Sequence, residues 1–573
     1  MFIKKLFVNN YRNLDGLDII FNDICNFVIG ENNIGKTNIL DLIHILFSKT
    51  PYRFFSEDDF KDLQKPIIIE ITIKLSNDEI GFFEDLFDPS NSSNINIIAT
   101  QNKNDQFIEF VHKETGQNIK RQIISQLNCI YYSSMQNPQS ELSFERKHGA
   151  GAFLSFLFKN YLDKNEIEEV NLVISDNMSE VIKYINGLLD NIDSIYGLRV
   201  DWDTKATNIV TRLLRLYDNS GRLLSEAGTG VQYISLILMS LLNHIYQIYI
   251  KSGNEVGYVV DGKRIISVLF ILDEPEIHLN PFAQRSLIKL IRNILSSNNQ
   301  KFNNLLKGLF DIDELYGQII IATHSPDILS DTYKEYIRVF ENESKQIKSI
   351  NGDEVVLDAQ IENHLLKQLE YIKQSFFAKK VIIFEGDSEY GFFSFRCREE
   401  AEFDFDNNQI SCIKAESADS VLPLYMLFDK YQIVPYAIID KDKYKSSYSA
   451  YPRFYSTTYL DFEEEIVQTL INYTEEDFLA KILYTYDSSG LNRIIDKDKF
   501  NYIAQRYNIN ISTTTPLKFA DVTDKDYKIV MYLSWLEINK KCRLGRIISE
   551  ILPKNLIPQA YSRTIEKCIK NEV

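Results

Sequence analysis

The hydrophobic and polar positions over the first 130 residues alternate as short β-strands separated by polar turns do. The three earliest apolar runs lie at 2–8, 17–21 and 25–29. Apolar side chains then recur every three or four residues over 38–46, which predicts a helix directly after the third run. Further strand-like runs follow at 66–75, 95–100, 107–111 and 126–132. We therefore expect a β-rich segment that contains one helix.

The pattern becomes helical in the middle of the chain. Residues 150–195 have a helical period, and residues 233–250 form a long apolar segment of the same kind. Strand patterns return at 265–272 and 318–323, and a helix is predicted over 281–295 between them. Buried strands alternating with helices are typical of an α/β fold.

A second α/β pattern begins after a polar stretch. Its first two strand-like runs, at 380–385 and 434–440, both end in acidic residues. We predict an α/β domain over 1–345, with a helical element inserted at about 146–200, a linker over 346–375 and a second α/β domain over 376–573.

Residues 30–37 have the sequence GENNIGKT, which fits the GxxxxGK[ST] pattern of a P-loop. A strand precedes it and a helix follows, so backbone N–H groups at the helix start can hold phosphate oxygens. Lys36 would reach the outer phosphates, and the Thr37 hydroxyl would join Mg²⁺. A chance glycine-rich turn is the alternative, and the flanking elements disfavour it. The predicted ATP contacts from this segment are Asn32, Asn33, Gly35, Lys36, Thr37 and Asn38.

Two strand ends further along the chain carry residues that complete an ATPase. The run 265–272 ends in Asp273, which can hold Mg²⁺, and Glu274, which can polarise the attacking water. The run 318–323 is followed by His324. This position resembles that of the switch histidine of ABC-type ATPases.

The segment LSEAGTGVQ at 224–232 places small residues just before the long apolar helix. It resembles the ABC-type signature segment, in which a helix N-terminus faces the γ-phosphate of ATP on another subunit. Ser225, Gly228 and Gly230 are its predicted ATP contacts, and this arrangement implies at least a dimer. The inserted element at 146–200 is too short for a coiled-coil arm, so we expect it to be a small helical dimerisation element.

Four carboxylates follow the strand-like runs of the second domain. Glu385 ends one run and Glu389 lies one helical turn later, while Asp440 and Asp442 follow the other run. Carboxylate oxygens that converge in this way form a site suited to Mg²⁺ or Mn²⁺. Two acid-rich turns without a site are the alternative.

The two strands ending in Glu-Gly and Asp-x-Asp, with a helix between them, resemble the Toprim domain. The resemblance implies phosphodiester chemistry, with Glu385 as general acid/base or ligand and with Glu389, Asp440 and Asp442 as metal ligands. A nearby lysine could neutralise the phosphate. Residues 537–546 offer a basic helix start, in which Lys541 is preferred to Lys540, and a solvated helix face is the alternative. The acidic run 461–465 could supply a further ligand, but an exposed, capped helix start is favoured.

An ABC-type ATPase followed by a Toprim domain resembles the OLD (overcoming lysogenization defect) family over essentially the whole chain. The size and layout are similar to the nuclease subunit of the Gabija antiphage system and to OLD-type effectors of some retrons. The resemblance implies metal-dependent DNA cleavage in antiviral defence, gated by the ATPase. A helicase or a retron RNA–DNA is a possible partner class under this hypothesis.

Composition adjusts this interpretation. The net charge of −17 disfavours unselective DNA binding and makes any DNA contact sensitive to salt. The six cysteines form no CxxC pair, which excludes the zinc ribbon of a bacterial-type primase. With no signal segment and no apolar run of membrane-spanning length found by inspection, we expect a cytoplasmic protein without a membrane partner.

Three functions remain open. The leading hypothesis is a Mg²⁺- or Mn²⁺-dependent DNA endonuclease with an ATP-hydrolysing domain, acting as a homodimer or higher homo-oligomer. The alternative is a DNA-repair-type DNA-binding ATPase of the RecF/SMC kind without cleavage. A Toprim primase or topoisomerase is the third, and a topoisomerase tyrosine cannot be identified among 33 tyrosines.

Overall fold

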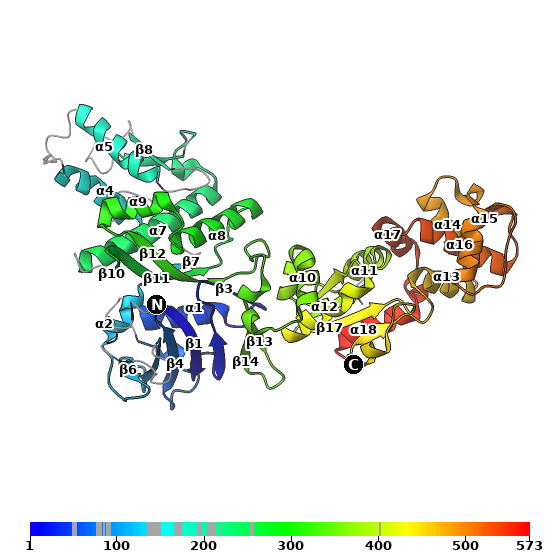
Figure 1. Cartoon of the computed structure of the whole chain (residues 1–573), viewed down its shortest axis with the longest axis horizontal. Coiled ribbons are helices and arrows are strands. Elements are labelled where there is room, and N and C mark those ends of the chain that lie inside the picture. The colour runs from blue at the N-terminus through cyan, green and yellow to red at the C-terminus, as the bar shows by residue number, and fades with distance from the viewer. Residues whose placement is uncertain are drawn as a thin grey trace. The chain divides into compact units, whose positions relative to one another are not determined.

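The computed structural model describes residues 1–48, 54–75, 79, 83, 86, 93–133, 150–164, 175–191, 198–202, 214–218, 220–252, 257–399 and 403–572. These residues form two compact units, Met1–Glu354 and Val355–Val573, which are treated separately below. Both units combine β-sheets with helices, so the predicted α/β fold is confirmed (Figure 1).

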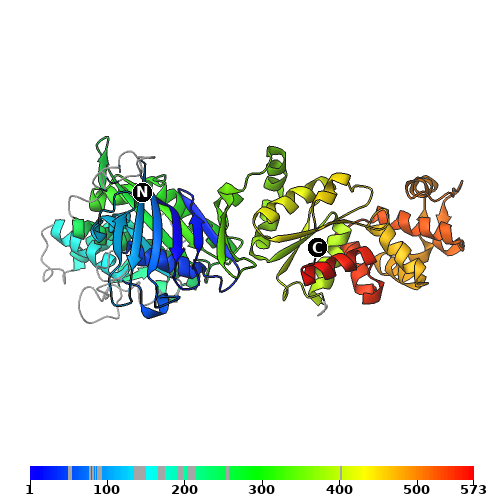
Figure 2. The same cartoon turned by 90° about the horizontal axis from the view of Figure 1, so that it is seen from below.

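The first unit contains an antiparallel sheet with the strand order β2-β1-β4-β5-β6, whose strands lie side by side in Figure 2. Along β4 and β5 every second residue is buried, as expected for a sheet with one face on a core. The strands are β1 (Phe2–Asn9), β2 (Leu17–Ile20), β4 (Ile67–Lys74), β5 (Asn94–Gln101) and β6 (Glu109–His112).

A seven-stranded sheet carries the phosphate-binding sequence. Its order is β10-β11-β12-β3-β13-β14, and β7 pairs with β11. The pairs among β7, β11, β12, β3 and β13 are parallel, so their carboxyl ends share one edge. The strands are β3 (Cys25–Gly30), β7 (Cys129–Ser133), β10 (Tyr258–Val260), β11 (Lys263–Asp273), β12 (Glu314–Ala322), β13 (Tyr336–Glu341) and β14 (Ile347–Asn351).

Helix α1 (Lys36–Phe47) lies between the two sheets, and its apolar face joins both in one core. Other helices of the unit contact its strands or neighbouring helices. They are α2 (Arg121–Ile124), α4 (Ala150–Lys164), α5 (Ser175–Leu189), α7 (Thr229–Ser252), α8 (Pro281–Leu295) and α9 (Gln300–Phe310). A hairpin of β8 (Arg199–Trp202) and β9 (Leu214–Tyr217) completes the unit.

The predicted helical insertion at 146–200 contains α4 and α5. Its segments 146–149, 165–174 and 192–197 lie outside the described residues. Helix α4 is fixed to the ATPase-like core by aromatic contacts, with the Phe156 ring stacked on Tyr246 of α7 at 4.1 Å between centroids. The dimerisation role of this element stays a prediction.

Helix α7 differs from the expectation that no segment reaches membrane-spanning length. Among the described helices, it alone is long and apolar enough to cross a membrane by length and composition, over Thr229–Lys251 with a mean hydropathy of 1.3. The residues of its most apolar window are 61% buried inside the protein, where α7 contacts α4 and β7. Burial in this core accounts for its apolar sequence.

The second unit is built on a parallel sheet with the order β16-β15-β17-β18. The strands are β15 (Lys380–Phe384), β16 (Ile410–Lys414), β17 (Val434–Ile439) and β18 (Phe454–Ser456). Helices α10 (Ala359–Ile372), α11 (Asp387–Glu399), α12 (Ala418–Lys430) and α18 (Gln559–Lys570) accompany this sheet. Of the predicted linker at 346–375, β14 belongs to the first unit and α10 to the second, so the two units join at residues 354–355.

A helical segment continues the second unit. It contains α13 (Phe462–Asn472), α14 (Glu476–Tyr486), α15 (Lys497–Arg506), α16 (Lys525–Ile538) and α17 (Cys542–Ile551), with short strands β19 (Ile494–Ile495) and β20 (Leu517–Lys518). Its apolar residues share one core with the parallel sheet. Helices α11 and α17 cross closely at two glycines. A Cβ on Gly545 would overlap the carbonyl oxygen of Ser388, and one on Gly391 would overlap that of Cys542.

Replacing Gly545 with Ala is expected to destabilise the second unit by about 1–3 kcal/mol, because the added methyl group forces two packed helix backbones apart. Gly308 on α9 is a matched control, since a Cβ there meets nothing within 4 Å. Gly308→Ala is expected to be neutral or stabilising by up to about 1 kcal/mol. Calorimetric unfolding of both variants measures the difference, and equal transitions would contradict the steric role of the crossing.

Candidate active sites

The P-loop connects the fully buried strand β3 to α1. Gly30 has a φ of 149°, and a Cβ there would overlap the carbonyl oxygen of Val339, so the loop needs glycine at this position. The Lys36 side chain is 5% exposed, and its Nζ donates hydrogen bonds to the carbonyl oxygens of Gly30 (3.0 Å) and Glu31 (2.6 Å). The loop thus holds the lysine amine at its centre.

A cavity of about 860 Å³ opens beside this loop. It contains all six of the P-loop residues predicted to contact ATP, together with predicted residues from two neighbouring strand ends. Its lining residues are Asn32, Asn33, Gly35, Lys36, Thr37, Asn38, Glu274, Glu276, Ile277 and His324. Strand β12 lies between β3 and β11 in the sheet, which brings segments more than 200 residues apart to one edge.

Carboxylates surround the position where a nucleotide-bound cation would lie. Burial raises the pKa of Asp273 to about 6, and the negative charge of Glu274 adds to the effect. Asp273 does not line the cavity itself, but its Oδ1 accepts a hydrogen bond of 3.4 Å from the Thr37 hydroxyl. An Asp–Thr pair of this kind fits Mg²⁺, whose charge would offset the cost of the buried carboxylate.

Glu274 and His324 both line the cavity, and their side chains lie close together. Glu274 has a φ of 46°, a left-handed backbone conformation that costs free energy in a non-glycine residue. The His324 Nε2 lies 3.5 Å from Glu274 Oε1, and the His324 backbone N–H donates to Glu276 Oε1 at 2.7 Å. Burial and then the charge of Lys36 lower the pKa of His324. A neutral imidazole beside a carboxylate is suited to sensing the γ-phosphate.

Sequence reasoning missed the contacts that Arg12, Asn13 and Glu276 make at this site. Asn13 Nδ2 donates to the Ile34 carbonyl oxygen at 3.1 Å, and Asn13 Oδ1 accepts from Asn38 Nδ2 at 2.8 Å. Arg12 also bonds to Asn38 Oδ1 at 2.6 Å. The polar turn after the first strand was visible, but its distance from the P-loop depends on the fold. Glu276 could have been found from the DEPE spacing after β11.

The signature-like residues lie away from the cavity of their own chain. Ser225 belongs to a short 3-10 turn, and Gly228 and Gly230 lie at the start of α7. Ser225 and Gly228 are exposed, whereas Gly230 is half-buried, and a Cβ added there would lie 3.0 Å from the His278 carbonyl oxygen. Gln232 Nε2 fixes the segment by donating to the Ala227 carbonyl oxygen at 2.9 Å. The structure does not bring these three residues to the P-loop of the same chain.

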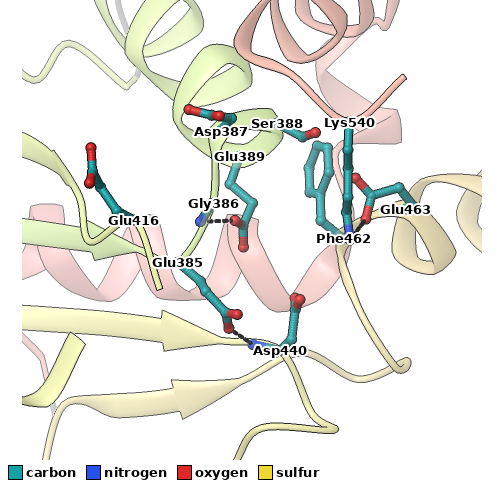
Figure 3. Close-up of a pocket in the computed structure, with 10 residues that line it drawn as sticks. All are labelled: Glu385, Gly386, Asp387, Ser388, Glu389, Glu416, Asp440, Phe462, Glu463 and Lys540. Carbon is teal, nitrogen blue, oxygen red and sulfur yellow. Dashed lines mark hydrogen bonds and ion pairs between the residues drawn. The ribbon is translucent and has the colours of Figure 1, made fainter. Parts of the chain in front are cut away.

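Three of the four predicted carboxylates of the second unit converge. Glu385 follows β15, Asp440 follows the adjacent parallel strand β17, and Glu389 lies on the first turn of α11. Figure 3 shows the three side chains pointing toward a common space. The Asp440 N–H donates to Glu385 Oε2 at 3.3 Å, and the Gly386 N–H donates to Glu389 Oε2 at 2.6 Å. The Tyr561 hydroxyl donates to Glu389 Oε1 at 2.8 Å.

The electrostatics of this pocket, whose volume is about 300 Å³, favour a cation. Burial raises the pKa of Asp440, and the charges of Glu389 and Glu385 add to it. Burial also raises the pKa values of Glu389 and Glu385. Asp440 Oδ1 is buried without a hydrogen-bond partner. An unpartnered carboxylate oxygen among repelling carboxylates fits a divalent cation with hard oxygen ligands.

Lys540, Phe462 and Glu463 border the other side of the pocket. Lys540 lines the pocket and its Nζ lies 2.7 Å from Glu463 Oε2, whereas Lys541 is not among the lining residues. The preference for Lys541 is therefore reversed. Asp461 does cap the helix at 461–465, since its Oδ1 accepts a hydrogen bond from the Glu464 N–H at 3.0 Å, but the expected exposure is wrong because Asp461 is 0% and Glu463 1% exposed. Their burial depends on α15 and α16, which local sequence does not reveal.

Asp442, the fourth predicted metal ligand, is not among the residues that line the pocket. Its Oδ2 lies 3.6 Å from Lys443 Nζ and 3.9 Å from an amino group of Arg506. Arg506 also pairs with Asp461 at 3.0 Å and with Glu537 at 2.8 Å. Asp442 is thus part of the ion-pair network that joins the helical segment to the sheet.

Comparisons with known proteins agree with two successive domains. A family model described as "AAA domain, putative AbiEii toxin, Type IV TA system" matches residues 25–330. A model described as "Overcoming lysogenization defect protein-like, TOPRIM domain" matches residues 376–442. The predicted combination of an ATPase domain with an OLD-like Toprim domain is therefore confirmed.

The curated relatives match this chain over 12–14% of their own length, and the solved structures match it over 99–100% of theirs. The chain is 52% identical to the DNA replication and repair protein RecF of Oceanobacillus iheyensis over 46 residues, which are 8% of this chain and 12% of RecF. With RecF of Bacillus cytotoxicus it shares 42% identity over 53 residues, 9% and 14% of the two chains. Among solved structures, the SMC head of Thermotoga maritima matches with 14% identity, a TM-score of 0.29 and coverage of 61% and 99%. An SMC head bound to the C-winged helix domain of ScpA matches with 13% identity, a TM-score of 0.36 and coverage of 62% and 100%.

Proposed function

The chain belongs to the AAA-domain family whose model matches residues 25–330, and we propose that it is an ATP-hydrolysing, metal-dependent DNA endonuclease of the OLD type. The observation that carries the nuclease assignment is the convergence of Glu385, Glu389 and Asp440 on one pocket bordered by Lys540. Carboxylates and a lysine around a single pocket suit phosphodiester hydrolysis.

In the nuclease site, Glu385, Glu389 and Asp440 would hold Mg²⁺ or Mn²⁺, and Glu463 is placed to add an oxygen. The metal supplies Lewis-acid activation of water and stabilises the leaving oxygen. Glu385 would act as general acid/base toward the attacking water or as a metal ligand, and its position at the strand end beside Asp440 supports this role. The Lys540 ammonium, held by Glu463, would balance the charge that develops on the phosphate.

In the ATPase site, Lys36 and the P-loop N–H groups would bind the phosphates of ATP, and Thr37 and Asp273 would hold its Mg²⁺. Glu274 would polarise the attacking water, with His324 beside the γ-phosphate. The exposed Ser225 and Gly228, together with the half-buried Gly230, would complete the site of a second copy, so we infer a homodimer or higher homo-oligomer. Nucleotide-driven closure of this dimer would gate access to the nuclease pocket.

The biological role follows from the family resemblance. We infer an effector of antiviral defence in the cytoplasm that cuts DNA and has no membrane partner, similar to the Gabija nuclease subunit or a retron-associated OLD effector. A helicase or a retron RNA–DNA would serve as the activating partner.

Cleavage of supercoiled and linear DNA in Mg²⁺ or Mn²⁺, with and without ATP, tests this function. We expect cleavage that EDTA abolishes and that nucleotide changes in the wild type but not in Lys36→Ala. Tight DNA binding with no cleavage under any metal or nucleotide would favour a DNA-binding repair ATPase, the alternative that the short matches to RecF support.

A further inference from the structure

The first turn of α17 carries basic side chains that the proposed nuclease mechanism does not use. Lys541, at the N-cap of α17, and Arg543 are both exposed. Within the described part of the chain, no carboxylate lies within 4.0 Å of either side chain's charged nitrogens. Arg543 instead lies over the ring of Tyr486, 5.0 Å from its centroid. Their positive charges are therefore available to a ligand.

This turn is fixed at the edge of the nuclease pocket. The backbone of Cys542 packs against Gly391, and Gly545 packs against the carbonyl oxygen of Ser388. Ser388 itself lines the pocket, and Lys540 reaches the pocket from the residue before Lys541. Arg546, one turn further along, lies over the Phe395 ring of α11 at 4.8 Å. The spacing between the basic turn and Glu389 is thus set by backbone contacts that leave no room for a side chain.

Because the protein is strongly acidic, it needs local positive charge to bind a polyanionic substrate. The chain has a net charge of −17, and carboxylates dominate the pocket itself. DNA phosphates are repelled by both, so binding next to this pocket requires local cations. Lys443, another lysine near the pocket, lies 3.6 Å from Asp442, whereas Lys541 and Arg543 have no such pairing.

We propose that Lys541 and Arg543 bind the backbone phosphates of DNA beside the scissile phosphate, and that the Gly391–Gly545 crossing sets their distance from the metal-binding carboxylates. This inference rests on the proposed nuclease function and names the surface that holds its substrate. The contact is to phosphates and not to base edges, so it carries no sequence preference.

The test is duplex DNA binding by the full chain in EDTA, measured by fluorescence anisotropy across about 50–200 mM salt. Lys541→Gln/Arg543→Gln is expected to weaken binding and to reduce the slope of log K against log salt by about 1.8, roughly 0.9 for each lost phosphate contact. Lys497→Gln/Lys499→Gln is the matched control. It removes two cations from the start of α15, where Lys499 lies over the Tyr502 ring at 5.5 Å.

The charge-conserving variant Lys541→Arg/Arg543→Lys is expected to retain the wild-type slope, which separates loss of charge from loss of fold. A double-glutamine variant with the wild-type slope, or a control with an equal loss, would overturn the proposal. Cleavage by the wild type in Mg²⁺ is scored separately. If the wild type cuts DNA and the double-glutamine variant keeps the wild-type slope, the DNA-binding surface is refuted and the nuclease function is retained. If the double-glutamine variant has a reduced slope and the wild type cuts no DNA, the surface is supported and the nuclease function is refuted.

Discussion

Glu385→Gln and Asp440→Asn are each expected to lower the rate of DNA cleavage by about a thousandfold or more. Asp440 Oδ1 is buried with no hydrogen-bond partner, and the Asp440 N–H donates to Glu385 Oε2, so both carboxylates face the same space. The amide replacements keep side-chain shape but remove negative charge. Initial rates on supercoiled DNA in Mg²⁺, with Mn²⁺ affinity measured by calorimetry, report both activity and metal binding.

Glu416→Gln is the control for these variants. Glu416 borders the same pocket, but its side chain points away from the other carboxylates in Figure 3, and its Oε1 lies 3.4 Å from Lys414 Nζ. We expect its cleavage rate and Mn²⁺ affinity to stay within about twofold of the wild type. Unchanged cleavage by Asp440→Asn would refute the carboxylate pocket as the nuclease site.

The parts of both sites that the sequence predicted share a physical origin. Lys36 follows β3, Asp273 ends β11 and His324 follows β12. The parallel pairing of these strands places their carboxyl ends at one edge. Glu385 and Asp440 converge because β15 and β17 are neighbours in the same way. An apolar run that ends in a charged residue can be recognised in the sequence. Parallel pairing of two such strands then brings their terminal charged residues close together.

The failures concern side chains whose neighbours come from distant helices. Asp442 was predicted as a metal ligand from its spacing, but Arg506 of α15 draws it into an ion-pair network. Glu463 was interpreted as solvent-exposed, yet Lys540, after α16, pairs with it in the pocket. Neither contact has a periodicity or spacing that a single sequence displays. The choice between Lys540 and Lys541 depends on which of two adjacent lysines lines the pocket, and the sequence alone does not reveal that it is Lys540.

Glu274→Gln is expected to lower ATP hydrolysis by about 10²–10³-fold while ATP binding is retained. Glu274 lines the nucleotide cavity and lies 3.5 Å from His324, whereas the phosphate contacts come from the P-loop. Lys36→Ala, by contrast, is expected to lose nucleotide binding, because it removes the ammonium held at the centre of the loop. Steady-state phosphate release and fluorescent-nucleotide binding measure the two effects separately.

Glu314→Gln provides the control, because Glu314 lies at the opposite end of β12 and pairs with Lys263 at 2.5 Å. Its hydrolysis rate is expected to match the wild type, and an equal loss in this variant would remove the special role of Glu274.

The wild type, Glu274→Gln and Lys36→Ala also test whether ATP gates DNA cleavage. If the ATP-bound state sets access to the nuclease pocket, Glu274→Gln keeps one constant cleavage rate after ATP is added, because the nucleotide persists. The wild type drifts toward its nucleotide-depleted rate as ATP is consumed, and Lys36→Ala shows no response to ATP. Identical time courses in all three proteins would mean that the two active sites work independently.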